Sequence, residues 1–360
     1  MCAHLHQNVK KYAASLLTAL HVLLFAGNGN AQWRTDNQSV SAEDWEQYKG
    51  KFLDGTGRVI DNANGYISHS EGQGYGMLLA FYAGSQTDFH LIWSFTKQHL
   101  LRRNDGLVSW KWDPHSVPRV PDRNNATDGD ILIAHALALA GESWSKPEYS
   151  KAALRIVRAI RRSALVRYAD DKLVLPGISG FSAKYRKDGP IINPSYWVYE
   201  AFHTFAELDD RESWNTVFRD GLVILGRTKI GPRSLPPDWV SPRGAPTPAD
   251  GFDPRFGYDA LRIPLYLVRA GIVDKDLLAR LAEGMSNSDG AVVMTNIKTG
   301  AIQETLTDPG YRIIPALALC VAEGMPVPEE LRKFEPTLYY PSTLHLLGLA
   351  FLSGRADGCR

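Results

Sequence analysis

The chain has 360 residues, of which 44% are hydrophobic and 10% are Phe, Trp or Tyr, and its formal net charge at pH 7 is +1. This length allows one large domain or two ordinary ones. The near-zero charge gives no electrostatic footprint for nucleic acid or for an anionic membrane surface, so neither is expected as a partner. Nine Trp and fifteen Tyr suit stacking on a neutral, hydroxyl-rich ligand, although core packing is the ordinary use of such rings.

The first 31 residues have the composition of a secretory signal peptide. Two lysines precede a short apolar run over residues 13–26, and residues 29–31 (Gly-Asn-Ala) are small enough for a cleavage site. The apolar run is short for a bilayer span. We therefore predict a signal peptide over 1–31, export to the periplasm or the exterior, and no membrane attachment after cleavage. A retained membrane anchor is the alternative.

The three cysteines predict neither a disulfide scaffold nor a metal site. Cys2 lies in the predicted signal, which leaves Cys320 and Cys359, and these could pair in an oxidising compartment. The chain has no CxxC, no HExxH and no cluster of His. We expect no metal and no other cofactor.

The first of the helical patterns in chain order covers residues 42–52, and five more outer patterns follow it. Of these, residues 146–163 show apolar residues at helical spacing with a basic outer face, which is typical of an amphipathic helix. The outer patterns are 42–52, 88–101, 146–163, 210–225, 273–284 and 329–334.

Between the outer patterns lie six short runs in which an acid, an aromatic residue or both accompany helix-start signals. Ser, Thr, Asn and Asp are preferred N-cap residues, and Pro is favoured just inside a helix. The runs are at 70–75, 127–130, 193–197, 258–262, 308–311 and 339–342. The helices after them are more uniformly apolar, as in 131–140 (ILIAHALALA), which indicates burial.

This alternation predicts an all-α fold, an (α/α)6 barrel of six inner and six outer helices, as a single domain over 32–360. If the inner helices run parallel, their six starts open onto one end of the molecule. Two segments depart from the helical pattern. Residues 291–305 predict a small β-hairpin insertion that turns at 298–300, and residues 228–254, rich in Pro and Gly, predict a long ordered loop.

Glycines at 72, 74 and 76 are unusual inside a helix, where each costs about 0.8–1 kcal/mol relative to Ala. They indicate that a neighbouring helix or a ligand approaches this backbone closely. The spacing G-x-G-x-G without a preceding strand is a poor match to a dinucleotide-binding motif.

The acids at the helix starts each have an ordinary structural explanation. Glu71 would complement a helix dipole. Ser70 with Gln73, and Thr127 with Asp130, have the form of capping boxes.

The capping boxes give Asp128 no role. Asp259 with Arg262 could be a simple ion pair. Pro264 would clash inside a helix that began earlier, so we expect the helix to start near Arg262 with Asp259 just outside it. Three acids at three starts on one face are therefore better explained by a shared site.

These runs resemble the motifs of glycoside hydrolase family 8. The resemblance rests on residues 126–130 (ATDGD) with Ile133, Ala134 and Trp144, on 70–76 (SEGQGYG), and on 258–264 (YDALRIP), and it extends from about 33 to 352. It implies a catalytic (α/α)6 barrel and endo-acting, inverting hydrolysis of β-1,4-glucosidic bonds in cellulose. It also implies a functional association with the cellulose synthase complex of bacteria.

The resemblance further implies the residue roles. Glu71 is expected as the general acid and Asp259 as the general base, with the carboxyl groups about 6.5–9.5 Å apart, as inversion requires. Six residues are expected to bind substrate, with Tyr311 and Tyr340 behind them: Asp128, Arg262, Tyr258, Tyr196, Trp197 and Trp112. Arg262 and Tyr258 would also support the base.

A helix start stabilises the anion of Glu71, whereas a general acid needs a raised pKa. We expect burial and the like charge of Asp128 to outweigh the dipole, so that the pKa of Glu71 lies above its usual value.

Three alternatives stay open. A family-8 hydrolase acting on xylan, chitosan or lichenan would keep the same acids, although cationic chitosan would favour more of them. A polysaccharide-binding relative without catalysis would keep the aromatic residues but need not keep both Glu71 and Asp259. Another helical enzyme, such as a terpene cyclase, would need a DDxxD cluster, which the sequence lacks.

Overall fold

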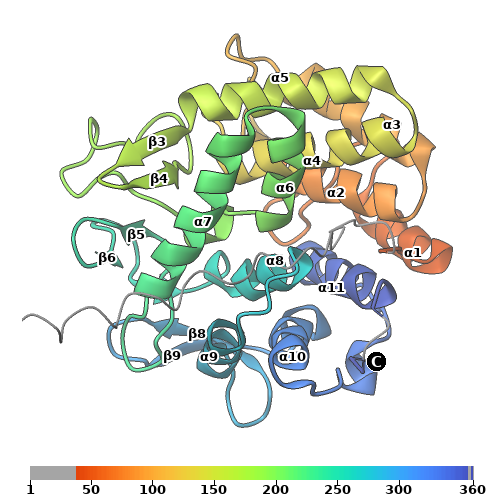
Figure 1. Cartoon of the computed structure of the whole chain (residues 1–360). Coiled ribbons are helices and arrows are strands. Elements are labelled where there is room, and N and C mark those ends of the chain that lie inside the picture. The colour runs from red at the N-terminus through yellow and green to blue at the C-terminus, as the bar shows by residue number, and fades with distance from the viewer. Residues whose placement is uncertain (1–37, 356–357, 360) are drawn as a thin grey trace, which may run out of the picture. The chain divides into compact units, whose positions relative to one another are not determined.

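Outer and inner helices alternate along the computed structural model, which describes residues 38–355 and 358–359 (Figure 1). The outer helices are α1 (Ala42–Phe52), α3 (Gln86–Phe95), α5 (Pro147–Ser163), α7 (Arg211–Arg227) and α9 (Lys275–Met285). The inner helices are α2 (Ser70–Tyr82), α4 (Thr127–Ser143), α6 (Tyr199–Leu208), α8 (Ile263–Arg269), α10 (Pro309–Glu323) and α11 (Tyr339–Ser353). The predicted barrel is confirmed; the predicted signal peptide lies outside the described residues.

The sixth outer position differs from the prediction. A single 3₁₀ turn, η5 (Glu329–Leu331), replaces the helix expected over 329–334. Prolines at 326, 328 and 336 bracket the segment and leave too few residues for a stable α-helix. The helix expected over 88–101 is likewise divided, because α3 continues as a π-helical turn, η2 (Thr96–Leu100).

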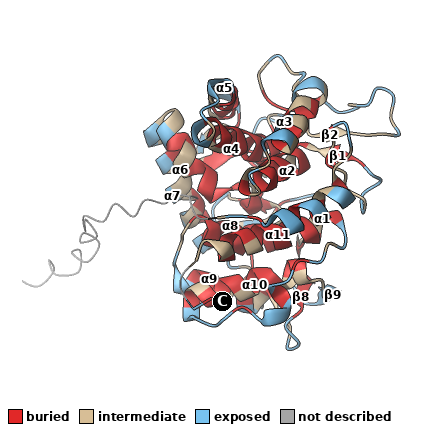
Figure 2. Ribbon diagram, turned by 90° about the vertical axis from the view of Figure 1, so that its right-hand side faces the viewer, coloured by how far each residue is buried: buried red, intermediate tan, exposed pale blue. Residues whose placement is uncertain are grey.

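Burial distinguishes the two layers of helices (Figure 2). Along α4 almost every residue from Thr127 to Ala140 is buried, whereas α5 buries one face, which includes Tyr149, Ile156 and Ile160. An amphipathic outer helix covers a helix that is apolar all round, as the sequence pattern predicted.

Glycines bring α2 and α4 together at the ends that carry Glu71 and Asp128. A Cβ atom on Gly74 would lie 2.5 Å from the Cβ of Leu132, and one on Gly129 would overlap the Oγ of Ser70. Gly76 faces Val59 in the same way. A neighbouring helix, rather than a ligand, therefore explains the close approach at Gly74.

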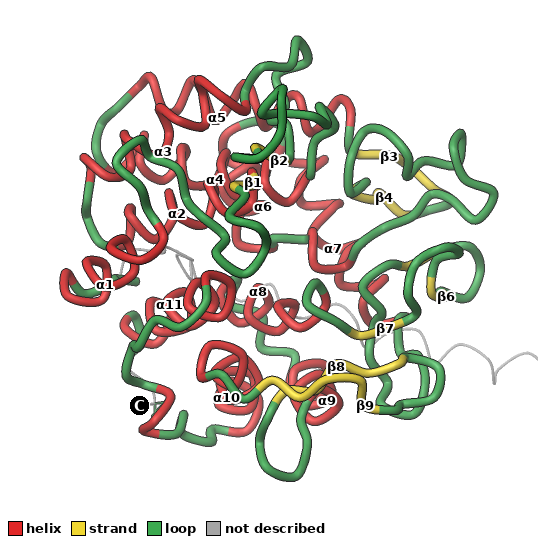
Figure 3. The backbone as a smooth tube through the Cα atoms, turned by 180° about the vertical axis from the view of Figure 1, so that it is seen from behind, coloured by secondary structure: helices red, strands yellow, loops and turns green. Residues whose placement is uncertain are grey.

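Within residues 38–355, strands occur only in connections and small sheets (Figure 3). The predicted hairpin is confirmed as β8 (Val292–Asn296) and β9 (Ile302–Leu306), and β7 (Arg255–Phe256) extends it to a three-stranded antiparallel sheet. The sequence did not predict the three remaining antiparallel pairs. These are β1 (Ser68–His69) with β2 (Lys111–Trp112), β3 (Leu165–Tyr168) with β4 (Asp171–Val174), and β5 (Val240–Ser241) with β6 (Thr247–Pro248).

The capping predictions are partly wrong. Asp308 caps α10 through the N–H of Gly310, as expected. At α2, however, the cap is the Nδ1 of His69, which accepts from the N–H of Gly72, and the amide of Gln73 instead accepts from the N–H of Val59 at 2.7 Å. Gln73 is fully buried, so its side chain holds a loop and does not close the helix end.

The second predicted capping box is also wrong. Thr127 begins α4 after Ala126, which provides no side-chain cap. The buried carboxylate of Asp130 accepts from the N–H of Val108 at 2.7 Å and from the Nδ2 of Asn125 at 2.9 Å. This acid therefore anchors the preceding loop to α4.

Two further features concern the chain termini and membranes. Cys320 in α10 and Cys359 are joined in a disulfide that closes 39 residues of sequence, a pairing that the sequence left open. Among residues 38–355, no helix combines the length and the apolar character needed to cross a bilayer.

We predict that Gly74→Ala destabilises the protein by about 1–3 kcal/mol, because the added methyl group overpacks the contact with Leu132. Chemical denaturation gives the free energy of unfolding. The matched control is Gly50→Ala in α1, where a Cβ would meet nothing within 4 Å and helix propensity favours Ala by about 0.8–1 kcal/mol. Equal stability of the two variants would contradict the packing argument.

Candidate active site

The starts of the six inner helices meet, as the sequence predicted. Arg262 ends the 3₁₀ turn η4 (Ala260–Arg262) before α8, and its guanidinium contacts Glu71 at the start of α2 and Asp128 at the start of α4. It also reaches Ser195 in η3 (Pro194–Tyr196), which precedes α6. Residues scattered over nearly 200 positions of sequence therefore share one site.

The starts of α10 and α11 join this site through three tyrosines. The ring of Tyr258 lies 6.1 Å from that of Tyr311 and 6.3 Å from that of Tyr340. The hydroxyl of Tyr340 donates to the backbone oxygen of Tyr258 at 2.8 Å. All six helix starts thus contribute side chains to the same end of the barrel.

Arg262 is the central cation of the site and is only 1% exposed. One terminal nitrogen donates to Glu71, and the other donates to Asp128 at 2.8 Å and to the Oγ of Ser195 at 3.2 Å. Asp259 lies farther away, at 4.0 Å. The strongest contacts of Arg262 are therefore with Glu71 and Asp128, and its expected support of Asp259 acts over a longer distance.

Glu71 and Asp128 form a hydrogen-bonded carboxyl pair beside this guanidinium. Burial opposes ionisation of Glu71, but the charge of Arg262 and the hydrogen bonds from Asp128 and Arg262 outweigh it and lower its pKa. Burial and the negative charge of Glu71 raise the pKa of Asp128 well above its usual range. The pair therefore favours keeping one proton, and Asp128 is the carboxyl whose environment favours the protonated form.

The expected raised pKa of Glu71 is thus wrong for the free protein. The sequence reasoning included burial and the charge of Asp128 but not a guanidinium in direct contact with the carboxylate. A buried opposite charge in contact favours the ionised form strongly.

Asp259 occupies a different environment from the pair. Its side chain is 32% exposed, whereas that of Glu71 is 16% exposed and that of Asp128 is 2% exposed. Burial raises the pKa of Asp259, with the charge of Glu71 adding to it, while Arg262 and a hydrogen bond from Asn193 oppose the increase. Solvent therefore reaches this carboxylate more readily than the other two.

Asn193 links Asp259 to the rest of the site. Its Nδ2 donates to the Oδ2 of Asp259 at 2.9 Å, and its Oδ1 accepts from both the N–H and the Oγ–H of Ser195. Ser195 in turn accepts from Arg262. The sequence identified Asn193 as a helix cap, which is correct, but did not reveal its contact with Asp259.

Asp238, in the loop before β5, was also missed. Its carboxylate is 3% exposed and accepts from the N–H groups of Gly257 and Ala260, both at 2.9 Å. Burial and the charge of Asp259 raise its pKa to about 7. The sequence predicted a long ordered loop over 228–254, and the available signal for Asp238 was an acid among its Pro and Gly residues.

The aromatic side chains predicted to bind the substrate, called aromatic platforms below, differ in their surroundings. Tyr196 is half-buried, with the guanidinium of Arg262 at 5.7 Å from its ring centroid, and Tyr258 is 36% exposed. Trp112 is half-buried, and two guanidinium groups, of Arg58 and Arg119, lie over its ring at 4.8 and 5.5 Å.

Trp197 is a core residue, which corrects its predicted role as a platform. Its ring is 2% exposed, and its Nε1 donates to the backbone oxygen of Val217 at 3.1 Å. Gly221 of α7 faces the ring so closely that any Cβ there would overlap it. The ring of Trp197 therefore packs against α7.

Trp239 is an aromatic residue near the site that the sequence did not single out. It stacks with Phe181 at 5.5 Å and with Phe252 at 4.6 Å between ring centroids, and its ring lies 6.3 Å from that of Tyr196. These rings connect the loop around residue 181 with the long loop that carries Asp238.

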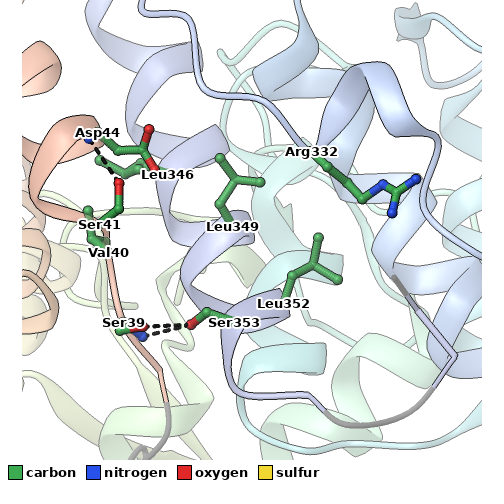
Figure 4. Close-up of a pocket in the computed structure, with 9 residues that line it drawn as sticks. All are labelled: Ser39, Val40, Ser41, Asp44, Arg332, Leu346, Leu349, Leu352 and Ser353. Atoms are coloured by element: carbon green, nitrogen blue, oxygen red, sulfur yellow. Dashed lines mark hydrogen bonds between the residues drawn. The ribbon is translucent and has the colours of Figure 1, made fainter.

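A separate pocket lies at the other end of α11 and contains none of these acids (Figure 4). It is lined by Ser39, Val40, Ser41, Asp44, Arg332, Leu346, Leu349, Leu352 and Ser353. No group of three or more His, Cys, Asp or Glu side chains within the described ranges is arranged to hold a metal ion. The carboxylates that gather around Arg262 at the helix starts are the candidate catalytic groups.

Comparison with known proteins identifies the class to which this barrel and its cluster of acids belong. The sequence profile of glycosyl hydrolases family 8 matches residues 24–313. The chain belongs to this family and is a glycoside hydrolase.

Several relatives cover most of the chain. A probable endoglucanase of Novacetimonas hansenii is 36% identical over 316 residues, which are 85% of this chain and 89% of that protein. The crystal structure of endoglucanase Cel10 from Klebsiella pneumoniae has a TM-score of 0.78 at 34% identity and matches 87% of this chain and 100% of that one. The endo-β-1,4-glucanase CMCax of Acetobacter xylinum has a TM-score of 0.75 at 33% identity and matches 88% and 98%.

The contrast between Trp197 and Tyr196 gives a stability prediction. Trp197→Phe should lower the free energy of unfolding by about 1–3 kcal/mol, because it leaves a void and removes the hydrogen bond to Val217. Tyr196→Phe is the matched control and should change stability by about 0.5 kcal/mol or less. Urea denaturation measures the free energy of unfolding of both variants. An unchanged stability of Trp197→Phe would contradict the assignment of Trp197 to the core.

Proposed function

We propose that this chain is an endo-acting β-1,4-glucanase that inverts the configuration at the cleaved bond, with Glu71 as general acid and Asp259 as general base. One observation carries the proposal: two carboxylates from different helix starts lie at one buried guanidinium, in contrasting environments. One has a proton-holding neighbour, and the other is partly exposed to solvent. Inverting hydrolysis needs this division between a protonated acid and a base that can reach water.

The relatives support β-1,4-glucan as the substrate. They include endoglucanases at 34–36% identity and a named endo-β-1,4-glucanase at 33%. Partly exposed rings at the site, Tyr196 and Tyr258, suit the apolar faces of a neutral sugar chain. Trp112 remains a proposed platform, although arginines already contact its ring.

On the acid side, the glycosidic oxygen takes a proton from Glu71 as the bond to the anomeric carbon breaks. The hydrogen bond between Asp128 and Glu71 lets the proton held by the pair move to Glu71. Asp128 is then left as a carboxylate that accepts from Arg262 and from hydroxyl groups of the sugar. The guanidinium stabilises the negative charge that proton donation leaves on the pair.

On the base side, Asp259 removes a proton from a water molecule, and the oxygen of that water attacks the anomeric carbon from the face opposite to the leaving group. Asn193 orients the carboxylate by donating to its Oδ2. After the reaction Asp259 carries the proton of the water, and the Glu71–Asp128 pair has lost its proton. Exchange with solvent restores both.

We further propose that the chain is exported, as one catalytic domain over 32–360, to the periplasm or beyond. The composition of residues 1–31 and the Cys320–Cys359 disulfide support an oxidising compartment outside the cytoplasm. We also propose a functional association with the cellulose synthase complex, which rests on the resemblance of the motifs at 70–76, 126–130 and 258–264. Measuring the protein in periplasmic and cytosolic fractions, before and after removal of residues 1–31, tests the export proposal.

A substrate panel tests the proposed activity. We expect the protein to hydrolyse carboxymethylcellulose faster than xylan, chitosan or lichenan. Glu71→Gln and Asp259→Asn should each reduce kcat by about 10²–10⁴-fold, the usual contribution of acid–base catalysis. Asp209→Asn, an acid that follows the C-terminal end of α6 and is paired with Arg158 and Arg161, is the matched control. Full activity of either site variant would overturn the roles, and preferential cleavage of another polymer would replace the substrate.

The shared proton predicts a shift in the pH profile of Asp128→Asn. The alkaline limb of kcat/KM reports loss of the proton that the acid pair needs. Asn at 128 removes the second carboxyl, whose charge opposes loss of the proton from the pair, while Arg262 still stabilises ionised Glu71, so the limb should move to lower pH. Stopped assays across the pH range measure the limb, and a limb that stays in place or moves upward would contradict the coupling.

A further inference from the structure

We propose that Asp238 is a positioning residue for the general base, because its buried carboxylate closes the turn that carries Asp259 and thereby directs Asp259 toward the attacking water. The inference rests on the proposed role of Asp259. It assigns a function to a residue that itself need not contact the sugar.

Asp238 accepts hydrogen bonds from the backbone on both sides of Asp259 in the sequence. Its Oδ1 accepts from the N–H of Gly257, two residues before Asp259, and from the N–H of Ala260, one residue after it. The backbone N–H of Asp238 also donates to the oxygen of Arg255 at 2.9 Å. A single buried side chain therefore fixes the backbone through which Asp259 is attached.

Asp238 also provides the cap that Asp259 would otherwise provide for itself. Asp259 occupies the N-cap position of η4, where an Asp side chain normally accepts from the first N–H groups of the helix. Here Asp259 makes no side-chain cap bond, and the N–H of Ala260, the first residue of η4, donates to Asp238 instead. The carboxylate of Asp259 is consequently left available for chemistry.

Close packing constrains the position of the Asp238 carboxylate tightly. A Cβ atom on Gly257 would overlap the Oδ2 of Asp238, and the Nε of Arg255 approaches the same oxygen at 3.4 Å. A glycine is therefore needed at 257 for the carboxylate to reach both N–H groups.

The loop that carries Asp238 is itself anchored. Trp239, the next residue, stacks almost parallel to Phe181 and Phe252, with interplanar angles of 8° and 16°. Beyond it, Val240 pairs with Ile192, adjacent to Asn193. The two residues that orient the base, Asp238 through the backbone and Asn193 through the side chain, therefore lie on paired segments.

Steady-state kinetics on a soluble cello-oligosaccharide, with Asp238→Ala, Asp238→Asn and Gly257→Ala, test the inference. Asp238→Ala should reduce kcat about 100-fold, the effect expected when a reacting group is misplaced by about 1 Å, and should change KM by less than about threefold. Asp238→Asn retains an oxygen that accepts both N–H bonds, so its kcat should stay within about tenfold of wild type. Gly257→Ala displaces the same carboxylate and should resemble Asp238→Ala.

Asp209→Asn is the control for the loss of a buried acid and should leave kcat and KM unchanged. Circular dichroism and thermal unfolding identify variants that do not fold; if Asp238→Ala is one of them, Asp238→Asn and Gly257→Ala decide the question. A folded Asp238→Ala with the kcat of wild type, a loss confined to KM, or an Asp238→Asn as impaired as Asp238→Ala would each overturn the inference.

These experiments distinguish failure of the proposed role of Asp238 from failure of the proposed function. If wild type does not cleave β-1,4-glucan, or if Asp259→Asn is fully active, the proposed function fails first. If wild type is active, Asp259→Asn is inactive and Asp238→Ala is normal, only the role of Asp238 is wrong.

Discussion

The site depends on one buried guanidinium surrounded by carboxylates. Arg262 is almost completely inaccessible to solvent, and it donates to Glu71 and Asp128 while lying within 4.0 Å of Asp259. Three acids at a buried end of a barrel would repel one another without such a cation, and a buried cation without partners would be costly. Its planar group can serve two carboxylates through separate nitrogens, which a lysine ammonium cannot do with the same geometry.

The same arrangement separates the acids into two chemical roles. Glu71 and Asp128 are neighbouring carboxyls, and burial disfavours a second negative charge on them, so the pair favours keeping one proton. Asp259 is held apart by Asn193 and by its own turn, and it is the most exposed of the three. A proton donor and a proton acceptor thus coexist because their neighbours differ, although all three groups are simple carboxylic acids.

The sequence predicted the convergence of the helix starts because local signals encode it. Cap residues, prolines and uniformly apolar runs mark each inner helix, and parallel helices must open at one end. It failed where the answer depends on partners distant in the chain. Nothing near Gln73 or Asp130 shows that their side chains hold loops, and nothing near Trp197 shows that Gly221 faces it. The contact between Arg262 and Glu71, which reverses the expected pKa shift of Glu71, is equally invisible in local sequence.

The stereochemistry of the first product tests the account most directly, because inversion requires water between Asp259 and the sugar while Glu71 acts from the other face. Proton NMR of a cello-oligosaccharide digest, recorded before the anomers equilibrate, resolves the new reducing end. The account predicts that the α-anomer appears first from the β-linked substrate. Initial release of the β-anomer would contradict the assignment of Asp259 as a base that activates water.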